Sequence, residues 1–296
     1  MNKGKLNAMI QKVSQNTGIV YNSVLAYYFM EDVLLKISKS EYRDNFIFKG
    51  GFLLSNIVGI SSRATMDMDF LLKNKELSEE AIEQIFDKIL NIKRVPITYR
   101  IDSIKPIREQ NFYGGFRVML LARFENLRQY IPLDFATGDI VTPCPIDYDY
   151  VSIFDQERIS VKAYPLETMV AEKMETIFSR GFLNSRSKDY FDLYLICKLQ
   201  EDKIDVKLLS NAIKNTFSYR NTKFDLVKLN DLIHQLRNNH IFIERWKTYR
   251  KKNSFVGDLE FGEVLDTISE LLLLLESLGT VQIKNAAEHL NDEDVQ

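Results

Sequence analysis

Two aspartates one residue apart, Asp67 and Asp69, are the first pair in this chain that could do chemistry. In a β-strand successive side chains point to opposite faces, so both carboxylates would leave one face while Met68 leaves the other. Ionised carboxylates side by side repel each other, and a divalent cation removes that repulsion. Oxygen ligands at this spacing suit Mg²⁺, which usually shares its coordination shell with substrate phosphates. The pair therefore predicts a cation site for phosphate chemistry.

A glycine pair, Gly50-Gly51, precedes the acids and separates two apolar segments. The simplest interpretation of residues 46–72 is a strand, a glycine turn, a helix and a second strand. Glycine lets the backbone approach a ligand closely, and free N–H groups at a helix N-terminus face anions. A D-x-D is by itself more often a solvated face, and a Gly-Gly is usually only a turn. Their order on the expected elements indicates phosphoryl or nucleotidyl transfer.

The sequence K-G-G, an expected helix and then R-x-T-x-D-x-D-F resembles the first motif of the AbiEii/AbiGii toxin family. This family is a branch of the nucleotidyltransferase superfamily related to DNA polymerase β. Fifteen residues separate Gly51 from Asp67, a gap that fits this branch better than the antibiotic-modifying branch. One departure is Phe52, where relatives often carry Ser or Thr, so a hydroxyl contact to phosphate is not expected there.

The resemblance implies roles for individual residues of this motif. Gly50 and Gly51 would admit the phosphates of a nucleoside triphosphate, and Arg63 would balance the triphosphate charge. Asp67 and Asp69 would bind Mg²⁺, the expected cofactor.

A third carboxylate is predicted at Asp134, in an expected strand over residues 130–136. Polymerase β-like enzymes take a third acid from an adjacent strand to complete a two-metal site. An equally good interpretation is that Asp134 stabilises the turn that follows the strand. Asp147 and Asp149 form a second D-x-D, but no glycine turn precedes them and nearby prolines favour a loop. We therefore expect no catalytic role for that pair.

Two helices of the C-terminal half carry further charged candidates. A helix that starts near Pro165 places Lys173 one or two turns inside, and the helix over 185–199 puts Asp189 and Asp192 on a shared face. Taken alone, such residues are usually exposed charges. Both segments, however, resemble the remaining AbiEii motifs, A-E-K and R-x-K-D-x-x-D-L. The resemblance implies that Lys173 neutralises triphosphate charge. It also implies that Asp189 orients the Lys173 side chain or binds the second substrate, and that Asp192 is structural.

Composition limits the function classes. The 296 residues are 45% hydrophobic and 27% charged with a net charge of −2, which is typical of a globular protein and excludes a uniformly basic nucleic-acid binder. Two cysteines are too few for a disulfide framework. The three histidines do not form the H-E-x-x-H pattern that is typical of zinc hydrolases. With neither a leader nor a membrane span expected, the sequence predicts a cytoplasmic protein without a membrane partner.

The expected fold is α+β. A helical N-terminal cap (1–40) precedes a polymerase β-like nucleotidyltransferase core with a mixed sheet (41–162). A helical C-terminal half (163–283) and a frayed acidic tail (284–296) follow, and the active site is expected in a cleft between core and helical half. In the C-terminal half, Trp246 and Tyr249 interleave with cations. This pattern suits either an RNA-binding surface or, slightly better, an amphipathic helix that buries its aromatic residues.

The resemblance implies the toxin of a bacterial toxin–antitoxin or abortive phage infection system, neutralised by a cognate antitoxin. It would transfer a nucleotide from an NTP to an RNA acceptor such as the 3′ end of a tRNA. Two alternatives stay open: a regulatory module that binds NTP or GTP without transfer, and an enzyme that nucleotidylates a small molecule such as an antibiotic.

Overall fold

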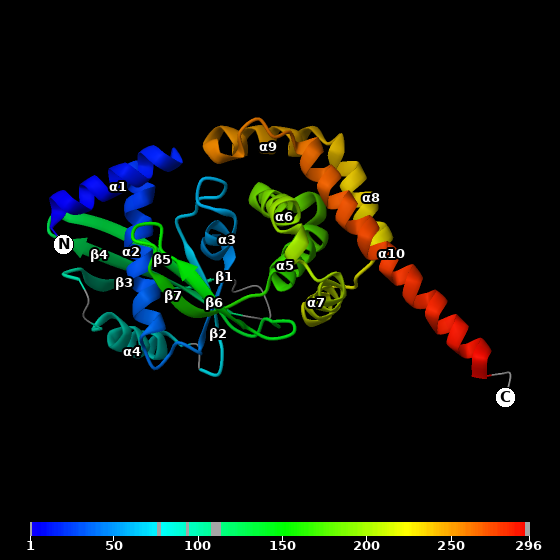
Figure 1. Ribbon diagram of the computed structural model, residues 1–296, viewed down its shortest axis with the longest axis horizontal. Helices are drawn as coiled ribbons and strands as arrows, with labels where there is room; N and C mark the ends of the chain where they lie inside the picture. Colours follow the sequence, from blue (N-terminus) through cyan, green and yellow to red (C-terminus); the bar gives the residue numbers. More distant parts are fainter. Residues whose placement is uncertain (1, 76–77, 93–94, 108–113, 294–296) are drawn as a thin grey trace. The chain divides into compact units, whose positions relative to one another are not determined.

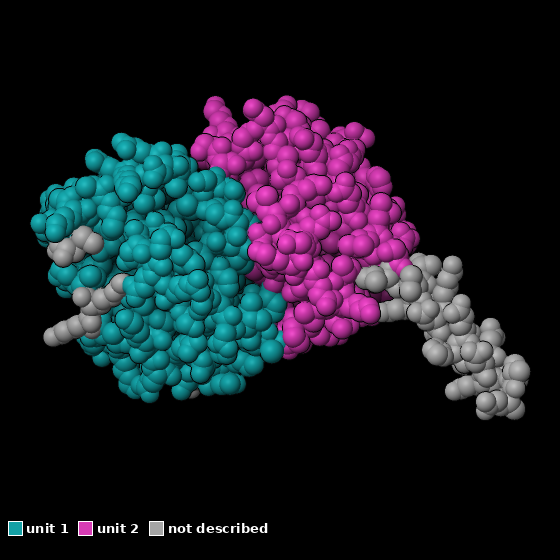
Figure 2. Space-filling view, viewed as in Figure 1, with its two compact units in different colours: residues 1–139, 144–165 teal, residues 140–143, 166–296 magenta. Residues whose placement is uncertain are grey.

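The structure is a computed structural model (Figure 1). It describes residues 2–75, 78–92, 95–107 and 114–293. The chain divides into two compact units, coloured separately in Figure 2. Unit 1 comprises Met1–Asp139 and Cys144–Pro165, and unit 2 comprises Ile140–Pro143 and Leu166–Gln296.

Unit 1 is built on a seven-stranded sheet with the order β3-β4-β5-β2-β1-β7-β6. Its strands are β1 (Phe46–Lys49), β2 (Met68–Leu72), β3 (Thr98–Ile107), β4 (Gly115–Phe124), β5 (Leu127–Ala136), β6 (Ile146–Val151) and β7 (Arg158–Ala163). The β1 strand pairs antiparallel with β2 and parallel with β7, and β2 pairs parallel with β5. The sheet is therefore mixed, and the α+β prediction is confirmed.

One strand of this sheet, β6, differs from the sequence prediction. Asp147 and Asp149 lie on the edge strand β6 and not in a loop, because the prolines at 143 and 145 precede the strand without interrupting it. Strands β3 and β4 pair antiparallel, with Ile107 opposite Gly115. Residues 108–113 of that connection lie outside the described residues.

The helices of unit 1 are α1 (Lys3–Thr17), α2 (Tyr21–Ser38), α3 (Gly50–Val58) and α4 (Glu79–Leu90). Helix α1 ends with Gly18 as its C-cap, which has φ 72°. Helix α2 is buried along most of its length and packs on β5 and β7 (Figure 1). Aromatic rings from β1, β2, α4 and β5 fill the core beneath the sheet, among them Phe46, Phe70, Phe86 and Phe135.

Unit 2 is helical, with α5 (Leu166–Arg180), α6 (Ser187–Leu199), α7 (Val206–Tyr219), α8 (Leu226–Arg237), α9 (His240–Lys252) and α10 (Phe261–Glu293). Trp246 on α9 is 1% exposed, and its Nε1 donates a hydrogen bond to the carbonyl of Leu259 at 2.8 Å. This burial agrees with the amphipathic interpretation of α9 and excludes base stacking on Trp246. Helix α10 continues to Glu293, so residues 284–293 are helical where a frayed tail was expected.

No helix in the part of the chain that the structure describes is long and apolar enough to cross a membrane.

Candidate active site

Asp69 lies in β2 and Asp67 directly precedes this strand, and the two acids share a face, as predicted. Met68 and Phe70 are buried in the core, whereas Asp67 and Asp69 are only half-buried. This alternation follows from the pleat of the strand. Asp67 Oδ1 also accepts a hydrogen bond from the hydroxyl of Thr65, which fixes one carboxylate oxygen.

Gly50 touches the second acid. Its φ is 74°, in the left-handed region that favours glycine. A Cβ built on Gly50 would lie 2.0 Å from Oδ2 of Asp69, closer than any side-chain contact allows. The glycine turn and the acid are therefore in direct contact, and a residue with a side chain does not fit here.

Gly51 lies against Arg63 and Thr65. A Cβ at Gly51 would be 3.1 Å from Arg63 Nη2 and 3.2 Å from Thr65 Oγ1. Arg63 itself is 5% exposed, and its Nη1 donates to the carbonyl of Ala64. Its positive charge is therefore buried behind the glycine turn, where it raises the local potential without reaching far into solvent.

Phe52 anchors the first turn of α3 in the core. Its ring is fully buried and contacts Tyr27, Phe48 and Tyr150, with ring centroids 5.1, 5.6 and 5.3 Å apart. The departure from Ser or Thr at this position thus exchanges a polar side chain for aromatic packing. It holds the helix that starts at Gly50 against the sheet.

A buried chain of hydrogen bonds ties the loop before the acids to α3. The Thr65 N–H donates to Tyr27 Oη at 3.1 Å, and this hydroxyl donates to Ser55 Oγ at 3.0 Å. Ser55 then donates to the carbonyl of Phe52 at 2.8 Å. No local pattern marks this chain in the sequence, because Tyr27 lies on α2, far from the motif that it supports.

Asp134 lies beside Asp69. In the parallel pairing of β2 with β5 these two residues are in register, so their side chains leave the same face. Strand β5 continues to Ala136, which places Asp134 inside the strand and not in a turn. The prediction of a third acid beside the pair agrees with this register, whereas the turn interpretation is wrong.

Arg117 is the partner of Asp134 that the sequence did not reveal. It lies opposite Asp134 on β4, and its Nε and Nη2 donate to the two carboxylate oxygens at 2.7 Å each. The pKa of Arg117 is raised, first by this hydrogen bond and also by the charges of Asp134, Asp67 and Asp69, while desolvation opposes the shift. All three acids therefore act on one guanidinium.

No group of three or more His, Cys, Asp or Glu side chains within the described ranges could hold a metal ion as it stands. Asp67 and Asp69 offer carboxylates on one face, whereas Arg117 occupies both oxygens of Asp134. This donor set fits a hard cation that takes further oxygen ligands from a bound phosphate, which is the usual manner of Mg²⁺.

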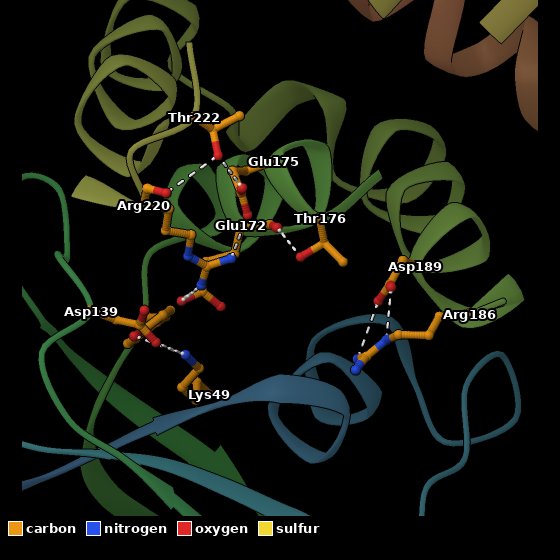
Figure 3. A network of polar contacts seen from close by, with 10 residues as sticks. Lys49, Asp139, Glu172, Glu175, Thr176, Arg186, Asp189, Arg220 and Thr222 are labelled. Carbon is orange, nitrogen blue, oxygen red and sulfur yellow. Dashed lines mark hydrogen bonds and ion pairs between the residues drawn. The ribbon is translucent and has the colours of Figure 1, made fainter. Parts of the chain in front are cut away.

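Lys49, directly before the glycine turn, is held by a buried ion pair. Its Nζ lies 2.9 Å from Oδ2 of Asp139, and the two side chains are 8% and 7% exposed (Figure 3). The ammonium also donates to the hydroxyl of Tyr164 at 3.1 Å. Because Lys49 is in register with Asp69 across β1 and β2, this clamp fixes the strand end from which α3 starts.

In unit 2, Lys173 on α5 contacts the two aspartates of α6. Its Nζ is 2.6 Å from Oδ2 of Asp192 and 3.5 Å from Oδ1 of Asp189, and both aspartates are almost fully buried. Arg186 Nε donates to Asp189 at 2.9 Å, as Figure 3 shows. The structure thus joins Lys173 and Asp189, as predicted. It makes Asp192, expected to be only structural, the closer partner of the ammonium.

A second ionic cluster holds α5 on either side of Lys173. Arg220 forms ion pairs with Glu172 at 3.1 Å and with Glu175 at 2.9 Å, and Thr222 donates to Glu175 at 2.7 Å (Figure 3). Both glutamates flank the lysine in sequence. Arg220 was not predicted, because only the tertiary fold brings it to α5.

The fold of this chain is shared by solved structures. It is similar to the crystal structure of a "putative nucleotidyltransferase" from H. pylori, with a TM-score of 0.54 and 14% identity over 86% of this chain and 97% of that chain. JHP933 from Helicobacter pylori is also similar, with a TM-score of 0.52 and 12% identity over 92% and 97% of the two chains. At these identities the likeness shows the fold alone.

The family follows from the sequence match. The model of the family described as "Nucleotidyl transferase AbiEii toxin, Type IV TA system" matches residues 32–267, and the chain belongs to this family. The predicted resemblance is thereby confirmed. No curated protein matches the chain. A type IV toxin–antitoxin family implies an antitoxin as partner.

Proposed function

We propose that this protein transfers a nucleotide from a nucleoside triphosphate to an RNA acceptor in a reaction that requires Mg²⁺. The observation that carries the proposal is the contact between the glycine turn and the acids: Asp69 packs on Gly50, and Asp67 leaves the same face. A phosphate bound at the N-terminus of α3 would therefore lie beside two carboxylates.

Each residue of the acid face has a role in this proposal. Asp67 and Asp69 would hold Mg²⁺, which when bound offsets the charge of the phosphates. The N–H groups at Gly50 and Gly51 would face phosphate oxygens, since neither residue carries a side chain to obstruct them. Arg63, buried behind Gly51, would act through its potential and not through direct contact.

Lys173 and Asp189 enter the proposal through the family motifs that they match. A lysine ammonium neutralises triphosphate charge, and the contacts with Asp189 and Asp192 restrict the rotamers that the Lys173 side chain adopts. The acceptor is proposed by family analogy to be the 3′ end of a tRNA. Its hydroxyl oxygen would bond to the α-phosphorus as pyrophosphate leaves.

Two observations favour a second candidate, a module that binds NTP or GTP without transfer. The aromatic residue at Phe52 supplies no hydroxyl beside the glycine turn, and Asp134 is bonded to Arg117. A small-molecule nucleotidyltransferase has no such support.

The test combines the purified protein, Mg²⁺, each α-³²P-labelled NTP, and either total tRNA or an aminoglycoside. Labelled tRNA is expected, and Asp67→Asn and Lys173→Ala should abolish the label while circular dichroism shows an intact fold. Nucleotide binding without transfer in every tube would favour the module. Label on the antibiotic, or full activity in Asp67→Asn, would contradict the proposal.

A further inference from the structure

A row of three charged side chains, one arginine and two aspartates, crosses the sheet of unit 1 at the candidate site. Strand pairing aligns Arg117 with Asp134 and Asp134 with Asp69, on strands β4, β5 and β2. Residues aligned in this way point to the same face. One guanidinium therefore faces the acids that would bind a cation.

The contact between Arg117 and Asp134 is of the strongest type that these groups form. Two donors of the guanidinium meet both oxygens of the carboxylate at 2.7 Å, in the bidentate geometry that orients and stabilises such pairs. Each oxygen of Asp134 thus already has a cationic partner. While this pair is closed, a metal ion at Asp134 would have to share the carboxylate with a positive charge.

The two partners differ in how free they are to move. The side chain of Asp134 is 13% exposed, whereas that of Arg117 is 47% exposed. Asp134 is fixed inside a strand, so opening the pair would require movement of the arginine into solvent or onto another anion. Phosphate oxygens offer a guanidinium the same bidentate geometry as a carboxylate.

We propose that Arg117 is a positioning residue that withholds Asp134 from the metal ion until phosphate oxygens draw the guanidinium away. The inference rests on the proposed function, because it assumes that Asp67 and Asp69 bind a cation next to Asp134. By linkage, the nucleotide then promotes cation binding at the third acid, and removal of Arg117 uncouples the two events.

The test measures cation binding without activity. Mn²⁺ replaces Mg²⁺, and free Mn²⁺ is followed by electron paramagnetic resonance in the absence of nucleotide. Arg117→Met, which keeps length but removes charge, should bind Mn²⁺ about five- to tenfold more tightly than the wild type, a coupling of ordinary size. Arg117→Lys, which keeps charge but loses the bidentate contact, should lie between them. Arg158→Met is the matched control, since Arg158 pairs with Asp149 at the β7–β6 edge of the sheet, away from Asp134.

A second measurement, of nucleotide binding without metal, should show the opposite effect of the same substitution. In EDTA, the fluorescent mant derivatives of ATP and GTP should bind Arg117→Met more weakly than the wild type, because the phosphates lose a cation. Tighter Mn²⁺ binding, together with weaker binding of nucleotide in the absence of metal, supports the proposal. Unchanged or weaker Mn²⁺ binding in both Arg117 variants overturns it, as does a gain that persists when Asp134→Asn is added.

The outcomes separate this inference from the proposed function. If Asp67→Asn and Asp69→Asn abolish Mn²⁺ binding while both Arg117 variants match the wild type, the cation site stands and only the role of Arg117 is wrong. If the wild type binds Mn²⁺ no better than these two variants, the cation site itself is absent and both proposals fail.

Discussion

Two D-x-D pairs occur at one sheet, the first where strand β2 begins and the second within strand β6. Asp67 and Asp69 are half-buried, Asp69 packs on a glycine turn, and a third acid is in register with it. Asp147 and Asp149 lie on an edge strand and are exposed, with side chains 66% and 53% accessible. The same three-letter pattern thus occurs in two different electrostatic settings.

The cations explain the difference. Asp147 bonds to Lys162 and Arg43, and Asp149 faces Arg158, so each carboxylate of the second pair has its own surface partner. The acids of the first pair share their face with Asp134. Three carboxylates there act on the guanidinium of Arg117, and a divalent ion would offset the repulsion between them. Neighbouring strands, and not the motif, make that distinction.

The sharpest test of this comparison exchanges one carboxylate in each pair. Asp69→Asn should lower nucleotide transfer by on the order of 10³-fold, because a charged group next to the reacting phosphates is lost. Asp149→Asn should retain wild-type turnover. Initial rates with labelled NTP and tRNA measure both, and equal rates in the two variants would remove the distinction between the pairs.

The glycine turn is tested by a matched pair of alanines. Gly50→Ala should lower the free energy of unfolding by about 3 kcal/mol, from the positive φ and the clash with Asp69, and should abolish transfer. Gly18 has nearly the same φ as Gly50, but a Cβ there would have nothing within 4 Å. Gly18→Ala should therefore lower the free energy of unfolding by only about 1 kcal/mol and leave activity unchanged. Urea denaturation gives both values. Similar losses in the two variants would mean that contact with Asp69 is unimportant.

A buried acid, Glu31, which is bonded to the strand that carries the second pair, makes the stability of the protein depend on pH. Glu31 accepts hydrogen bonds from Tyr150 on β6 and from the N–H of Ile153, and burial raises its pKa to about 7 although these bonds lower it. The folded state therefore holds a proton that the unfolded state releases near pH 4.5, so this group's contribution to stability falls as pH rises to about 7 and is constant above it.

Glu31→Gln does not titrate. Its free energy of unfolding, relative to that of the wild type, should rise by about 2 kcal/mol between pH 5.5 and pH 8. Urea titrations of both proteins at several pH values measure this difference. A difference that stays constant with pH would show that Glu31 is ionised throughout the range.

The smallest effect is expected for the hydrogen-bond chain that supports the first pair. Tyr27→Phe leaves the N–H of Thr65 without its partner and should cost about 1–2 kcal/mol of stability. Transfer should fall less than in Asp69→Asn, because the carboxylates remain. Thermal unfolding and initial rates measure the two effects, and an unchanged melting temperature would show that water replaces the hydroxyl.

The sequence was most informative where a feature depends on near neighbours. The glycine turn, the helix after it and the alternation of Asp67 with Met68 follow from local periodicity and were predicted. Arg117 could not be predicted, because strand pairing alone places it opposite Asp134. The loop expected around Asp147 was wrong for a related reason: the prolines before it mark where a strand begins, not that one is missing.

The connection between β4 and β5 has a consequence far from its own position. Only two residues, Glu125 and Asn126, join Phe124 to Leu127, which pair directly. Strand side chains repeat every second position, so a single inserted amino acid in this hairpin could slip β5 by one place. Asp134 would then rotate into the hydrophobic interior while an apolar neighbour took its place. An insertion in this surface hairpin could thus abolish nucleotide transfer without substituting any residue of the acid face.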